Sequence, residues 1–223
     1  MKKLIPLLFL GIAFGMIEGS VVIYLRPFLN NDFSDYSLKI LQPENLDQSK
    51  KTVIITEIYR EAATLVLLAS AAVLAATSFL SWFCYFVFIF GVWDIIYYVW
   101  IYLRIGWPES IMEWDVLFLI PRMWFAPVIV PCLISLTGIV ISMIVLRVTD
   151  IYGQIKPRPR HWIPIAVALV LWQISFLNKS LDGMTTFPSD YSWWLFFAGM
   201  IMAVSGSAFF VFDFFIAGNI ERT

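Results

Sequence analysis

Six long apolar stretches dominate this chain and leave little room for any fold other than a membrane bundle. A helix crosses the hydrocarbon core of a bilayer with about 20 apolar residues. Stretches of this kind lie at residues 4–25, 53–80, 81–103, 123–148, 162–177 and 191–218. With 61% hydrophobic and only 14% charged residues, the chain cannot hide its apolar side chains in a water-soluble core. We therefore predict an all-α polytopic membrane protein, with residues 1–223 forming one domain of six transmembrane helices.

Charge, histidine and cysteine content argue against several kinds of site. Fifteen basic and sixteen acidic residues give a net charge of −1, so no basic surface for nucleic acid is expected. His161 is the single histidine, and a bis-histidine haem site is therefore not expected. Cys84 and Cys132 both lie in apolar stretches, which argues against a disulfide or a zinc site.

Basic residues in the short connections indicate how the helices are oriented. The connection at residues 147–161 carries four basic residues and one acid, and an even number of spans puts it on the same side as Lys2 and Lys3. Positively charged loops favour the cytoplasm. We expect a multi-pass protein of the plasma (inner) membrane with both termini cytoplasmic. A cleavable signal peptide is the alternative for the first span, whose apolar run exceeds the roughly 7–15 residues of a signal sequence.

Three acids lie at one depth in three of the predicted helices. In this orientation Glu18, Glu61 and Asp94 are roughly 10–15 Å below the outer helix ends, at about 1.5 Å per residue. Ionisable residues at membrane depth are costly and normally face a helix bundle or an aqueous cavity. Glu18 also shares a helix face with glycines spaced every four residues, which allow close approach of a neighbouring helix. We predict that the three acids form one outer-face site with general acid or base roles.

Further polar residues lie on the same helix faces as these acids. Glu57 and Arg60 are neighbours of Glu61, because residues three and four apart share a face of a helix. Tyr98 lies four residues after Asp94. We expect Glu57, Arg60 and Tyr98 to bind ligand, with Arg60 coupled to Glu61 and able to hold an anionic group. The alternative is a salt-bridge ladder at the interface that has only a structural role.

The connection at residues 107–121 predicts a short helix that covers the bundle. Pro108 suits the first position of a helix and Pro121 ends one, and the about 12 residues between them are too few to span a bilayer. On a helical wheel Asp115 falls on the apolar side. We expect an interfacial or re-entrant helix with Asp115 turned inward as a ligand-binding residue. The alternative is that Asp115 caps this helix or pairs with Arg122.

Two other polar features are expected to be structural. The outer loop at residues 27–52 carries charges of both signs and is long enough to fold over the mouth of the bundle, but a solvated connector is favoured. Asp213 lies near the inner end of the last span. We expect it to pair with Lys2 or Lys3 near the lipid headgroups.

Three classes of function remain open. The first is an enzyme or binding protein for a lipid-borne or outer-leaflet substrate, whose carboxylates act as acids and bases or hold a divalent cation such as Mg²⁺, Mn²⁺ or Ca²⁺. The second is a proton- or cation-coupled carrier, although the inner half offers only Gln173 and Asp213. The third is a non-catalytic assembly subunit whose small-residue faces contact membrane partner subunits. We favour the first class, with the lipid bilayer as the expected environment and partner.

The orientation predicts which connections are accessible from outside the cell. A cysteine introduced at Ser49 should react with a membrane-impermeant thiol reagent in intact cells. A cysteine introduced at Gly153 should react only after permeabilisation. The reverse pattern would move the predicted site to the cytoplasmic half of the membrane.

Overall fold

Six long helices make up most of the computed structural model, which describes residues 2–29, 48–120, 122–153, 157–177 and 190–220. Each helix contains a stretch that is long and apolar enough to cross a membrane. This confirms the prediction of an all-α, multi-pass membrane protein. The helices are α1 (Leu4–Leu29), α2 (Gln48–Ala75), α3 (Phe79–Ile105), α4 (Ile129–Tyr152), α5 (Pro159–Leu177) and α6 (Trp193–Ile220).

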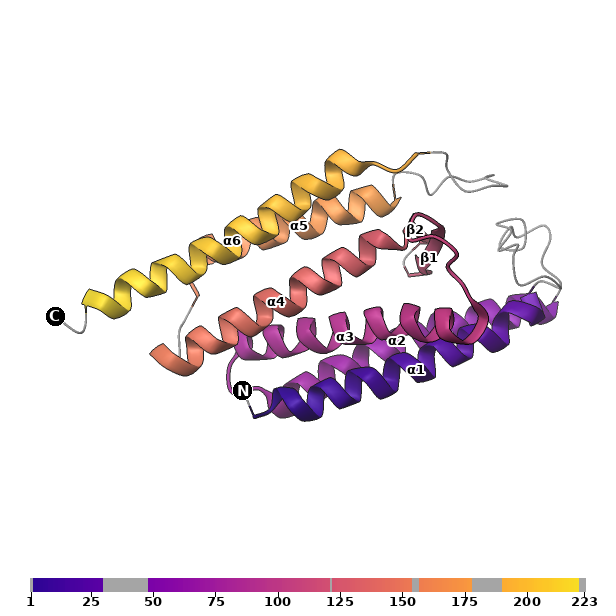
Figure 1. Ribbon diagram of the computed structural model, residues 1–223, viewed down its shortest axis with the longest axis horizontal. Helices are drawn as coiled ribbons and strands as arrows, with labels where there is room; N and C mark the ends of the chain where they lie inside the picture. The colour runs from indigo at the N-terminus through magenta and orange to yellow at the C-terminus, as the bar shows by residue number, and fades with distance from the viewer. Residues whose placement is uncertain (1, 30–47, 121, 154–156, 178–189, 221–223) are drawn as a thin grey trace.

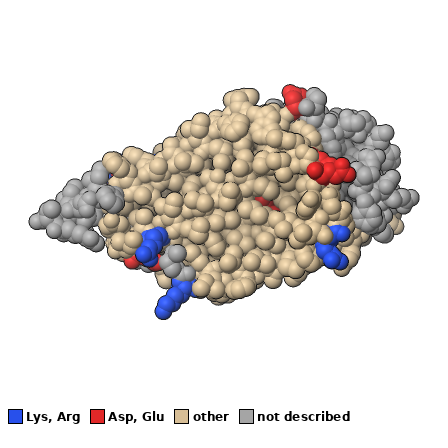
Figure 2. Space-filling model, in the orientation of Figure 1, with Lys and Arg blue, Asp and Glu red and all other residues tan. Residues whose placement is uncertain are grey.

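The helices alternate in direction along the bundle (Figure 1). The start of α1 and the end of α6 therefore lie at the same end, which we call the terminal end. The opposite end carries the two short strands β1 (Trp114–Phe118) and β2 (Trp124–Pro127), and we call it the hairpin end. On the face shown in Figure 2, charged residues gather near the two ends, and the wide belt between them shows only a small acidic area.

Helix α3 holds one half of the bundle together, because α1, α2 and α4 all pack against it. Helix α6 does the same for the other half, where it contacts both α5 and α4. The α1–α3 contact is very close. A Cβ atom added at Gly15 would lie 2.7 Å from the carbonyl oxygen of Trp93 and 3.0 Å from the Cβ of Ile96. Glycine at this position thus allows the two helix backbones to approach.

Several predicted helix boundaries differ from the observed ones by four to six residues. The second helix ends at Ala75 rather than near residue 80, and α3 begins at Phe79. The cause is a capping box: the Ser78 hydroxyl accepts a hydrogen bond from the Ser81 N–H, and the Ser81 hydroxyl accepts one from the Ser78 N–H at 2.9 Å. This pair satisfies backbone donors at the start of α3 and stops α2 from continuing into it.

The fourth helix begins at Ile129 rather than near residue 123, because the residues before it form a strand. The predicted interfacial or re-entrant helix at residues 107–121 is therefore wrong. Strands β1 and β2 pair antiparallel, with Asp115 opposite Ala126 and Val116 opposite Phe125. Aromatic residues in both segments, together with Val116 in β1, favour strands. Pairing also satisfies backbone groups that an isolated short helix would leave open at both ends.

Some predicted features lie outside the described residues. The outer loop at residues 27–52 is shorter than predicted, because α1 extends to Leu29 and α2 begins at Gln48. Residues 30–47 of that loop lie outside the part of the chain that the structure describes.

Replacing Gly15 by leucine should destabilise the bundle. The new side chain would meet the backbone of α3, which cannot move away as a flexible side chain could, so we expect a loss of about 1–3 kcal/mol in the free energy of unfolding. The melting temperature in detergent measures it. Ala13→Leu on the exposed face of α1 is the matched control and should have little effect. Equal stability of the two variants would contradict a close α1–α3 contact.

Candidate functional site

A cavity of about 430 Å³ runs along the inside of the bundle and receives side chains from all six helices and from the hairpin segment. Its α3 lining extends from Phe83 to Tyr98, which corresponds to about 22 Å at the helical rise of about 1.5 Å per residue. The charged residues belong to the half nearer the hairpin, and the other half is lined almost entirely by apolar side chains. All seven predicted site residues line this cavity: Glu18, Glu57, Arg60, Glu61, Asp94, Tyr98 and Asp115.

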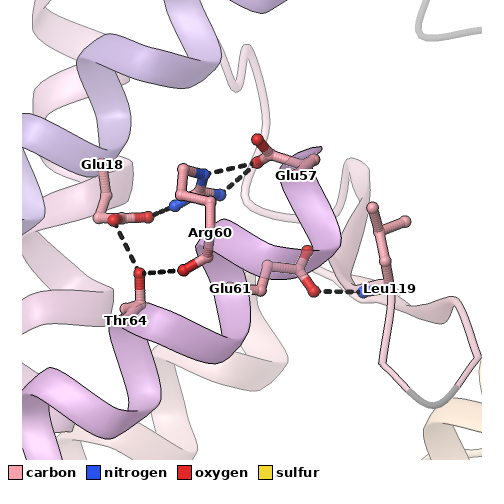
Figure 3. A network of polar contacts seen from close by, with 6 residues as sticks. All are labelled: Glu18, Glu57, Arg60, Glu61, Thr64 and Leu119. Atoms are coloured by element: carbon pink, nitrogen blue, oxygen red, sulfur yellow. Dashed lines mark hydrogen bonds and ion pairs between the residues drawn. The ribbon is translucent and has the colours of Figure 1, made fainter. Parts of the chain in front are cut away.

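Arg60 of α2 lies between two carboxylates (Figure 3). Its guanidinium forms ion pairs with Glu18 of α1 and with Glu57 one turn earlier on α2. Glu18 is only 4% exposed, and its other oxygen accepts a hydrogen bond from the Thr64 hydroxyl at 2.9 Å. Arg60 therefore joins α1 to α2 and has its charge shared by two acids, which leaves little of that charge for an anionic ligand.

Glu61 is turned away from this cluster, toward the hairpin (Figure 3). Its Oε2 accepts a hydrogen bond from the backbone N–H of Leu119 at 2.9 Å. The ion-pair partners of Arg60 are thus Glu18 and Glu57 rather than the expected Glu61. Glu61 instead connects α2 to the segment that follows β1, and both Glu61 and Leu119 line the cavity.

Two more acids enter the cavity from α3 and β1. Asp94 is 8% exposed, and its Oδ2 accepts a hydrogen bond from the Ser135 hydroxyl of α4 at 2.8 Å. Asp115 is 5% exposed, and its Oδ2 accepts a hydrogen bond from the Tyr98 hydroxyl at 2.9 Å. Asp115 does point inward, as its place on the apolar side of the segment predicts, but a strand rather than a helix brings it there.

Apart from Arg60 Nη1, which is ion-paired with Glu18, three buried N–H donors of cavity-lining residues make no hydrogen bond within the described residues. They are the indole nitrogens of Trp93 and Trp124 and the amide nitrogen of Gln173. A buried donor without a partner costs about 1–3 kcal/mol and is rare in folded proteins. Sequence analysis missed both tryptophans, because a tryptophan at the lipid interface and one facing a cavity look alike in a sequence. Gln173 could have been predicted as a cavity residue, because its amide is an isolated polar group in an apolar span.

Asp213 belongs to a separate cluster at the terminal end, and the expected pairing with Lys2 or Lys3 is wrong. Its carboxylate pairs with Arg160 and lies 2.8 Å from the Nε2 of His161. The close packing of α5 on α6 brings these residues together. Lys3 instead donates a hydrogen bond to the carbonyl oxygen of Ala75 at 2.6 Å. None of these residues lines the cavity.

Within the described residues, no three histidine, cysteine, aspartate or glutamate side chains are grouped closely enough to hold a metal ion. The five cavity acids are instead divided among contacts with Arg60, Thr64, Leu119, Ser135 and Tyr98. Comparison with protein-family models, with curated proteins and with solved structures finds no match for this chain. Its function must therefore be inferred from the site itself.

The Glu18–Arg60 contact predicts strong energetic coupling between these two residues. Arg60→Met or Glu18→Gln alone leaves a buried charge without its partner, and each should lower the free energy of unfolding by about 3–5 kcal/mol. The double variant should recover about 0.5–3 kcal/mol relative to the sum of the single losses. Unfolding in detergent measures this cycle. The matched cycle of Arg60→Met with Glu61→Gln should be closer to additive, and equal coupling in both cycles would contradict this pairing.

Proposed function

We propose that this chain is an integral membrane protein that binds a lipid-borne, amphiphilic molecule. The polar group of that molecule would lie at the carboxylate and arginine cluster near the hairpin, and its hydrocarbon chain would lie in the apolar half of the cavity. The single observation that carries this proposal is the division of one continuous cavity into a charged half and an apolar half. Ligand sites are commonly largely apolar with a few convergent polar groups.

The unpaired donors support a ligand rather than an empty packing defect. Trp93, Trp124 and Gln173 each present a buried N–H without an acceptor in the described chain. All three belong to the cavity lining. A bound molecule with oxygen acceptors would recover the free energy that these groups lose by leaving water.

The cavity residues divide into two roles under this proposal. Glu18 and Glu57 hold Arg60, and these three form the wall that joins α1 to α2. Asp94 and Glu61 each use one oxygen in a hydrogen bond to the protein, so their second oxygens are available to the ligand. Asp94 and Glu61 are therefore the groups we propose for direct ligand contact and for any general acid or base role.

We further propose that the protein lies in the plasma (inner) membrane with both termini cytoplasmic. The basic residues of the connection between α4 and α5 favour that side by the positive-inside rule. The hairpin end then faces outward, so the charged half of the cavity lies in the outer leaflet. An outer-leaflet lipid could enter with its headgroup already at the correct depth.

The two rival functions have less support from the contacts. Among the described residues, the small-residue faces proposed for partner subunits are used within the chain: Gly15 packs on α3, and Gly199 packs on Trp172 of α5. A coupled carrier would be expected to have a polar path through both halves of the membrane. The cavity lining carries its charged residues in one half only.

A photoreactive long-chain alkanol, with a diazirine in its hydrocarbon chain, tests chain binding. We expect saturable labelling of the apolar cavity segments of α3 and α4 in protein reconstituted in lipid nanodiscs. Thr137→Phe, which fills the apolar half, should reduce this labelling several-fold. The matched control is Leu136→Phe, since Leu136 is 53% exposed and does not line the cavity. Labelling that does not saturate, or that both variants leave unchanged, would refute the proposal.

A further inference from the structure

We infer that the polar group bound in this cavity is a neutral polyol, such as a glycosyl or glyceryl headgroup, rather than an anionic or a cationic one. This inference rests on the proposed function and names the chemical class of its ligand. It follows from the hydrogen-bonding groups that line the cavity and from the balance of their charges.

The charge balance argues against an anionic headgroup. Among the described residues that line the cavity, five carry carboxylates, and Arg60 is the one cation. Arg60 already pairs with Glu18 and Glu57. A phosphate or carboxylate headgroup would meet the remaining acids with no free cation to offset the repulsion.

The acceptors of the site require a ligand that can donate hydrogen bonds. Asp94 uses Oδ2 for Ser135, and Glu61 uses Oε2 for Leu119. The other oxygen of each acid makes no hydrogen bond within the described residues. An ionised carboxylate accepts but does not donate, so a hydroxyl or an ammonium group would suit these positions.

The donors of the site require acceptors as well, and this argues against an ammonium headgroup. Trp93 is 7% exposed, and its indole N–H has no partner in the described chain; the same holds for the N–H groups of Trp124 and Gln173. An ammonium group has no lone pair to accept from them, whereas each hydroxyl both donates and accepts. A headgroup with several hydroxyls can therefore donate hydrogen bonds to the carboxylates and accept hydrogen bonds from the N–H groups.

Competition against the photoreactive alkanol tests the headgroup class. Competitors share one alkyl chain and carry a glucosyl, glyceryl, phosphate or primary ammonium group, and protein is reconstituted in nanodiscs as before. The glucosyl and glyceryl compounds should displace the alkanol at concentrations at least about tenfold lower than the phosphate and ammonium compounds, as expected for one charge-assisted hydrogen bond. Tighter displacement by the phosphate or the ammonium compound would overturn the inference.

A donor deletion tests the same inference from the protein side. Trp93→Phe removes the indole N–H and keeps an aromatic ring, and should weaken displacement by the glucosyl compound roughly 3–10-fold. Trp194→Phe is the matched control, because Trp194 is 72% exposed and lies outside the cavity lining. Retained labelling by the alkanol shows that the Trp93 variant is folded.

The outcomes separate the two proposals. Saturable alkanol labelling with equal displacement by all four headgroups would leave the proposed function standing and refute the polyol inference. Absence of saturable labelling in the unmodified protein would refute the proposed function itself.

Discussion

Hydrocarbon offers no hydrogen-bond partner, so a polar group at membrane depth costs free energy unless the protein or a molecule bound to it supplies one. This constraint accounts for the hairpin, the least helix-like part of the chain. Strands β1 and β2 satisfy each other's backbone groups, and the N–H of Leu119 just beyond β1 finds the Glu61 carboxylate at 2.9 Å. An irregular segment can therefore cover the end of the cavity because an acid from α2 completes its hydrogen bonding.

The same constraint links helix packing to the site. Gly15 allows α1 to lie directly against the backbone of α3, and Glu18 follows it by three residues on the same part of the helix. Because α1 and α2 both pack near α3, Glu18 meets Arg60 and Thr64 of α2 rather than lipid. The ion pair between Glu18 and Arg60 thus depends on the close α1–α3 packing that Gly15 allows.

Periodicity and depth were sufficient to predict six helices and six of the charged and tyrosine residues that line the cavity from these helices, because both follow from the regular geometry of a helix. Asp115, the seventh predicted residue, enters from a strand. Specific partners were not predictable in this way. Arg60 has one acid three residues before it, Glu57, and one residue after it, Glu61. The position of α1 determines which acids pair with Arg60, because α1 brings Glu18 to the side on which Glu57 lies. The hairpin is not evident from residues 107–121, because prolines at both ends of that segment fit a helix and a strand connection equally well.

The protein has two polar clusters, and they differ in how many buried N–H donors lack a hydrogen-bond partner within the described residues. This difference favours the cluster near the hairpin as the site of function. At the terminal end, Asp213 accepts from Arg160 and lies against the Nε2 of His161, while the Nδ1 of His161 accepts from the Arg158 N–H. Both ring nitrogens and the Oδ2 of Asp213 are thus occupied, and no buried N–H donor of that cluster lacks a partner within the described residues. In the cavity, donors such as the Trp93 N–H and acceptors such as the second oxygen of Asp94 remain open within the described chain. A fold that gives up about 1–3 kcal/mol for each such donor regains part of that free energy when a molecule with oxygen acceptors binds there.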